Sequence, residues 1–116
     1  QFRDGWRAIM RALDLYRARG DGVGFACSVL HLAAGAVPGP RLARICEEAL
    51  ELLGDHDEAL WAAVVARLTS PFFTERFATG ASVQERRERA LAIAERLQLH
   101  AVEAELLVNS AARAGV

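Results

Sequence analysis

The sequence predicts an all-α protein made of three antiparallel helix pairs stacked side by side. Ala, Leu, Arg and Glu are residues of high helix propensity and dominate the composition, whereas the strand formers Val, Ile and Thr number only nine, three and three. Apolar residues recur at helical spacing in six segments separated by Gly, Pro or polar turns. An Ala-Leu step recurs at 12–13, 49–50 and 90–91, and the intervals of 37 and 41 residues are typical of two-helix repeats.

The first predicted pair covers residues 4–19 and 23–37. Asp4 can cap the first helix, and Gly20-Asp21-Gly22 ends it. The apolar face of this helix consists of Trp6, Ile9, Met10, Leu13 and Tyr16. The second helix is apolar almost all round, so we expect it to be covered on most sides.

The second predicted pair begins after Pro38-Gly39-Pro40, and Pro40 suits the first turn of the third helix. Gly54 ends that helix, and Asp55 with Glu58 forms a capping box for the fourth helix, which Ser70-Pro71 ends. The buried stripe of the third helix is Leu42, Ile45, Cys46, Ala49, Leu50 and Leu53. That of the fourth is Leu60, Trp61, Val64, Val65 and Leu68.

The third predicted pair follows an irregular connection over residues 72–81. Ser82 and Glu85 form a second capping box, and Gln98-Leu99-His100 turns the chain into the sixth helix. The apolar faces are Val83, Ala90, Leu91, Ala94 and Leu97, then Val102, Leu106, Leu107 and Ala111. One helix pair cannot bury such a face alone, whereas three stacked pairs can. The apolar end at 106–108 predicts an exposed patch and self-association.

Composition narrows the class of protein. The net charge of −1 provides no basic field for nucleic acid. The longest apolar run, residues 23–37, is interrupted by Ser28 and His31 and is too short to cross a membrane.

Cys27 and Cys46 lie in apolar runs and are predicted to be reduced, mostly buried thiols of a cytoplasmic protein. All basic residues apart from histidine are Arg, which fits a GC-rich bacterial genome. We expect residues 1–116 to form a single helical-repeat domain, a fragment of a larger protein.

No motif predicts an enzyme, a metal site or a cofactor. The glycine-rich stretch 20–24 follows a helix instead of the strand that a dinucleotide fingerprint requires, so we interpret it as a helix-helix turn. The acids at 55–58 are explained by helix capping. His31, His56 and His100 fall in three different pairs, with no nucleophile motif nearby.

Four polar residues are candidates for binding: Ser28, His31, Arg67 and Asn109. Ser28 and His31 are the polar side chains in the apolar run of the second helix and share one face. Superposing the first pair on the third by their Ala-Leu steps, a shift of 78 residues, places His31 over Asn109. These groups either contact a partner in a groove or are hydrogen-bonded parts of the structure, and the second interpretation is favoured because most buried polar groups are bonded.

Residues 47–55 (EEALELLGD) and 88–97 (ERALAIAERL) resemble degenerate tetratricopeptide repeats, and more narrowly the helical arm of large bacterial LuxR-type regulators. Those regulators join a nucleotide-binding ATPase to this arm and to a DNA-binding helix-turn-helix. The resemblance implies an α-α superhelix whose concave side is formed by the second helix of each pair. The Trp, Gly, Tyr and Pro landmarks of a standard tetratricopeptide repeat are largely missing, and the ATPase loop and DNA-reading helix lie outside this chain.

The sequence therefore predicts a protein-protein interaction or regulatory arm of a larger signalling or transcription-regulating protein. Its partner would be a protein, a peptide or another domain of the same chain. The alternative is a sensing domain that takes a peptide or small apolar molecule into its concave groove. A deep, closed apolar pocket would favour the sensor, and a shallow open groove would favour the docking arm.

Overall fold

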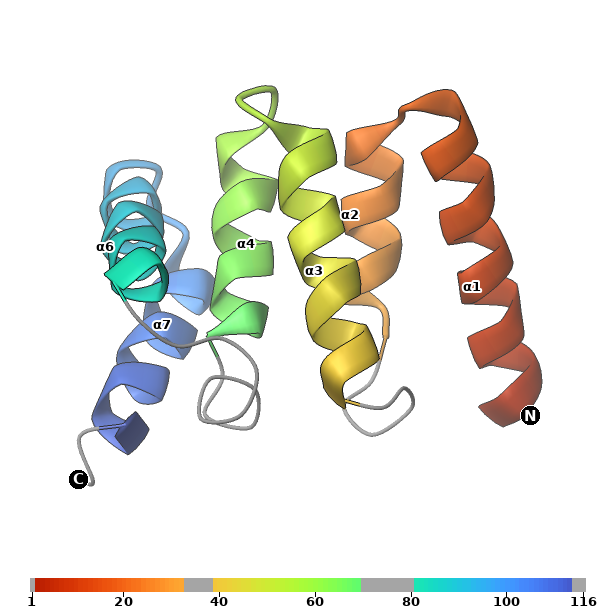
Figure 1. Ribbon diagram of the computed structural model, residues 1–116. Coiled ribbons are helices and arrows are strands. Elements are labelled where there is room, and N and C mark those ends of the chain that lie inside the picture. Colours follow the sequence, from red (N-terminus) through yellow and green to blue (C-terminus); the bar gives the residue numbers. More distant parts are fainter. Residues whose placement is uncertain (1, 33–38, 70–80, 114–116) are drawn as a thin grey trace.

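A computed structural model describes residues 2–32, 39–69 and 81–113, and all regular structure in these ranges is helical (Figure 1). The helices are α1 (Phe2–Arg19), α2 (Gly22–Leu30), α3 (Gly39–Leu53), α4 (Glu58–Leu68), α6 (Ala81–Arg96) and α7 (His100–Arg113). The predicted all-α class is confirmed for the described part of the chain. None of these helices is both long and apolar enough to cross a membrane.

Consecutive helices pack against one another in an antiparallel manner. Figure 1 shows them in a row, with α1 at one end and α6 and α7 at the other. Contacts also link helices two steps apart, α2 with α4 and α4 with α7. The central helix α4 therefore touches α2, α3, α6 and α7, and its apolar surface is shared among them.

The core follows the predicted helical periodicity most closely in α3 and α4. All six residues of the predicted α3 stripe are buried, as are Trp61, Val64, Val65 and Leu68 of α4. Leu13, Phe25, Ile93 and Leu106 join them from α1, α2, α6 and α7. Because burying one large apolar side chain contributes about 1.5–3 kcal/mol, this shared cluster is the main source of stability.

The glycine-rich stretch between α1 and α2 is a helix-helix turn, as predicted. Gly20 adopts a left-handed φ of 67°, and the Asp21 N–H donates to the Tyr16 carbonyl at 2.9 Å. Asp21 then caps α2 by accepting from the Gly24 N–H at 2.9 Å. Gly22 is buried against the end of α3, where a Cβ would lie 2.6 Å from the Leu52 carbonyl carbon.

Helix α2 differs from its prediction in length. It ends at Leu30 instead of residue 37, and the N–H groups of His31 and Leu32 turn back to carbonyls only three residues earlier, which closes the helix. Residues 33–38 lie outside the described ranges. The buried residues of α2 are Gly22, Phe25, Ala26 and Val29, which form a single stripe. Within α2 the exposed residues are Val23 and Cys27, and Gly24, Ser28 and Leu30 are partly buried, so the helix is covered on most sides, as expected.

Cys27 lies on the uncovered face of α2 together with Val23 and is exposed, so its predicted burial is wrong. A residue five positions after Gly22 falls outside the buried stripe of a 3.6-residue helix. Cys46 is fully buried, as predicted. Burial raises the pKa of the Cys46 thiol to about 12.

The two thiols should therefore react very differently with a thiolate-selective disulfide reagent. At about pH 8 we expect Cys27 to react rapidly in the native protein, and Cys46 only after unfolding, because it is both inaccessible and protonated. The time course of released thionitrobenzoate measures this. Cys27→Ser should remove the fast phase. Equal rates at the two positions in native protein would contradict this packing of α2 and α3.

The observed N-terminal ends of α4 and α6 also differ from the predicted ones. The N-cap of α4 is Asp57, which accepts from the Leu60 N–H at 3.0 Å, and not Asp55. Gly54, with φ 52°, starts a turn that delays the helix by two residues. Ser82 lies inside α6 and does not cap it, because the helix begins at Ala81. Ala81 was predicted to be the last residue of the irregular connection 72–81, and the other residues of that connection lie outside the described ranges.

Acids on α3 bind arginines from both flanking helices. Arg17 of α1 donates to Glu48 with Nε and with Nη2, the latter at 2.8 Å. This hydrogen bond lowers the pKa of the Glu48 carboxyl. Arg86 of α6 donates to the neighbouring Glu47 at 2.6 Å. Adjacent acids thus connect α3 to α1 on one side and to α6 on the other.

Candidate functional site: a pocket between α3, α4 and α6

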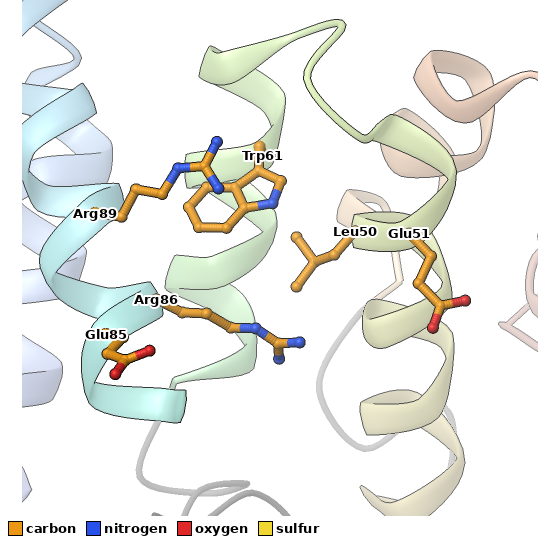
Figure 2. Close-up of a pocket in the computed structure, with 6 residues that line it drawn as sticks. All are labelled: Leu50, Glu51, Trp61, Glu85, Arg86 and Arg89. Carbon is orange, nitrogen blue, oxygen red and sulfur yellow. The ribbon is translucent and has the colours of Figure 1, made fainter. Parts of the chain in front are cut away.

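A pocket of about 390 Å³ opens between α3 and α6, with α4 at its base (Figure 2). Its six lining residues come from all three helices: Leu50, Glu51, Trp61, Glu85, Arg86 and Arg89. Because α4 packs against both α3 and α6, it holds the two walls of the pocket in place.

Helical spacing explains why these side chains meet. Leu50 is the edge of the buried α3 stripe, and the next residue, Glu51, is exposed beside it. Trp61 lies one turn after the Asp57 cap of α4. On α6 the lining residues are 85, 86 and 89, and positions three and four apart share a face of a helix. The pocket thus has an apolar floor and charged walls.

Trp61 and Arg89 contact each other in the pocket. The Arg89 guanidinium lies 4.3 Å from the centre of the Trp61 ring, within the range of a cation-π contact. Arg89 also reaches Asp55, at 3.4 Å, but the Asp55 side chain is 95% exposed. Surface ion pairs of this kind contribute between about 0 and 1 kcal/mol, and an exposed cation-π contact contributes about 0.5–1 kcal/mol, so both contacts hold Arg89 with similar strength.

The arginines of the charge run 85–89 make contacts within the protein and across to neighbouring helices. Arg86 crosses to Glu47, and Arg87 is buried and donates to Gln84 at 2.8 Å. Arg89 lies on Trp61 and pairs with Asp55, and not with Glu85 four residues before it. The three-residue spacing of Arg86 and Arg89 shows in the sequence that they share one face of a helix. Nothing in the sequence places Trp61 beside them.

The other two charged residues of the pocket are carboxylates. Glu51 on α3 and Glu85 on α6 are both exposed, and neither forms an ion pair with any residue in the described ranges. Figure 2 shows them on opposite walls, with the Arg86 side chain between them. The chemistry available here is recognition by charge, hydrogen bonding and apolar contact.

The four binding residues predicted from the sequence lie outside this pocket. Ser28 donates to the Gly24 carbonyl of its own helix at 3.0 Å, and His31 is exposed at the end of α2. Arg67 of α4 donates to the Leu32 carbonyl at 3.1 Å. Asn109 of α7 is buried and donates to the Ala66 carbonyl at 2.9 Å.

The side chains of Arg67 and Asn109 both bind backbone carbonyls of another helical segment. Each donates to a backbone carbonyl where another helix ends: Arg67 to Leu32, two residues past the end of α2, and Asn109 to Ala66, in the last turn of α4. Position 31 is exposed whereas position 109 is buried, so the 78-residue shift does not place them in equivalent environments. Binding of a partner by any of the four stays a prediction.

The acids at 55–58 are engaged within the protein. Asp55 pairs with Arg89, Asp57 caps α4, and Glu58 pairs with Arg96. Within the described ranges, no group of three or more His, Cys, Asp or Glu is placed to hold a metal ion.

No family model, curated protein or solved structure matches this chain. What is established is a small all-helical unit whose consecutive helices pack together, with a mixed polar and apolar pocket between α3, α4 and α6. The function is therefore argued from this pocket.

Proposed function

We propose that this chain is a protein-protein interaction module whose α3–α4–α6 pocket receives a segment of a partner protein. The observation that carries this is the composition of the pocket: an indole and a leucine at the base, with two arginines on one wall. Trp and Arg are the residues most enriched in the hot spots of protein interfaces. Four of the six lining residues are charged, which suits a peptide better than a small apolar molecule.

The wider setting that we propose is a regulatory arm of a larger signalling or transcription-regulating protein. The support is the resemblance of residues 47–55 and 88–97 to the helical arm of LuxR-type regulators, together with the antiparallel packing of consecutive helices. In this proposal the helix pairs form a tetratricopeptide-like α-α superhelix, and the partner is another protein or another domain of the same chain.

A random peptide library displayed on phage, selected against the folded chain, tests the docking proposal. Selected peptides, synthesised and titrated into ¹⁵N-labelled protein, should shift the indole N–H signal of Trp61. Trp6, on α1, provides an internal reference signal outside the pocket-forming helices. Trp6→Phe assigns the two signals.

A steric block completes this test. Glu85→Trp fills the pocket from its α6 wall and should weaken every selected peptide by about tenfold or more, whatever its charge. Glu105→Trp, at an exposed position on α7, is the matched control and should change affinity less than about twofold. Failure to select any peptide, or full affinity in Glu85→Trp, would contradict docking at this pocket.

A further inference from the structure

We propose that copies of this chain associate head to tail, with the outer face of α1 in one copy packed on the outer face of α7 in the next. These faces are separate from the α3–α4–α6 pocket, since neither α1 nor α7 contributes a lining residue to it. The two helices lie at opposite ends of the row (Figure 1). Two features support the proposal: the way in which helix pairs join within the chain, and the apolar side chains that are exposed on these two helices.

Helix pairs join in the same way at both junctions within the chain. The second helix of one pair packs on the first helix of the next, α2 on α3 and α4 on α6. In the described ranges no helix precedes α1, which packs on α2, and none follows α7, which packs on α4 and α6. Because α1 is a first helix and α7 is a second helix, each presents the side of a junction that the other lacks.

On α1 the large apolar side chain that this arrangement leaves exposed is Leu15. The Ala-Leu steps align it with Leu52 of α3 and with Ile93 of α6, at the same intervals of 37 and 41 residues. Leu52 is partly buried against the core and Ile93 is buried, whereas Leu15 is 55% exposed. A position that is covered in the second and third pairs is thus open in the first.

On α7 the exposed apolar side chains are Leu107 and Val108. Of the patch predicted at 106–108, Leu106 is buried in the core, and Leu107 and Val108 are 51% and 65% exposed. In α4, the second helix that has a further pair packed on it, residues 64–66 are all buried. A first helix packed on α7 as α6 packs on α4 would cover the open face of α7 in the same way.

The two faces also carry complementary charge. Helix α1 has five arginines against two aspartates, and α7 has two glutamates against one arginine. Arg11 and Glu105 are exposed, each three or four residues from an exposed apolar side chain, and neither forms an ion pair with a described residue. Within the chain, Arg96 of α6 already pairs with Glu58 of the preceding second helix, α4. Packing α1 on α7 brings opposite charges together, whereas packing two identical faces would bring like charges together.

Sedimentation velocity at rising protein concentration tests this inference and should show species larger than a monomer. Leu15→Asp on α1 and Val108→Asp on α7 each place a charge in the apolar contact and should weaken association by about tenfold or more. Both side chains are exposed within one chain, so the variants should keep the circular dichroism spectrum of the original. Val23→Asp, at an exposed apolar position on α2, is the matched control and should associate like the original chain.

An equimolar mixture of the two interface variants shows which faces meet. Leu15→Asp retains an intact α7 face and Val108→Asp an intact α1 face, so the mixture should form a heterodimer that grows no further, although each variant alone is monomeric. If two α7 faces met instead, Leu15→Asp alone would still dimerise and the mixture would contain no heterodimer, which would overturn the proposal. An original chain that stays monomeric at its highest soluble concentration would overturn it as well.

Discussion

Gly22→Ala is expected to lower the free energy of unfolding by about 3 kcal/mol, at the upper end of what one inserted methyl group costs in a packed interior. A Cβ at this position would lie 2.6 Å from the Leu52 carbonyl carbon and 2.8 Å from the Leu53 nitrogen. Both atoms belong to the backbone of α3, so no side-chain rotation can relieve the clash. The start of α2 would have to move away from the end of α3. Urea titration followed by circular dichroism at 222 nm measures the loss.

Gly5→Ala is the matched control because the same methyl group is added where nothing lies within 4 Å. Gly5 is in α1 and exposed, so the variant should be more stable by up to about 1 kcal/mol through higher helix propensity. The two substitutions are thus expected to have opposite signs. A Gly22→Ala protein as stable as the original would show that α2 and α3 are not in contact at this point.

Asn109→Ala is expected to cost about 1–3 kcal/mol, the penalty for leaving a buried polar group without its partner. Asn109 is 7% exposed, and its side-chain amide reaches the Ala66 carbonyl at the end of α4. Thr69 also donates to this carbonyl, but at 3.3 Å, and does not replace the bond across to α7. Thermal and urea unfolding measure the effect.

His31→Ala provides the contrast. His31 is exposed at the end of α2, so the change should alter stability by less than about 0.5 kcal/mol. Both variants also decide whether the residues predicted from the sequence take part in binding. Peptides selected on the original chain should bind both variants unchanged per folded molecule if the pocket between α3, α4 and α6 is the docking site. Weaker binding to stable His31→Ala protein would support the groove interpretation instead.

Local sequence signals determined most of the secondary structure. The helical spacing of Leu42 through Leu53 predicted the buried face of α3 without any knowledge of its neighbours. Gly20 and Gly54 end their helices with positive φ, as their position after an apolar-periodic segment predicts. Gln98, in the turn between α6 and α7, takes the same left-handed conformation with φ 58°, although it is not a glycine. These features depend on the backbone freedom and spacing of residues close together in the chain, so the sequence alone reveals them.

The tertiary structure decided which side of each helix is covered and which polar groups meet. Cys27 stands in an apolar run, yet it is exposed, because it lies with Val23 on the side of α2 that the neighbouring helices leave uncovered. Asn109 and Arg86 find their partners 43 and 39 residues away, at Ala66 and Glu47. The pocket is likewise assembled from three helices around Trp61. Such contacts depend on how separate helices lie in space, and periodicity within one helix contains no information about that placement.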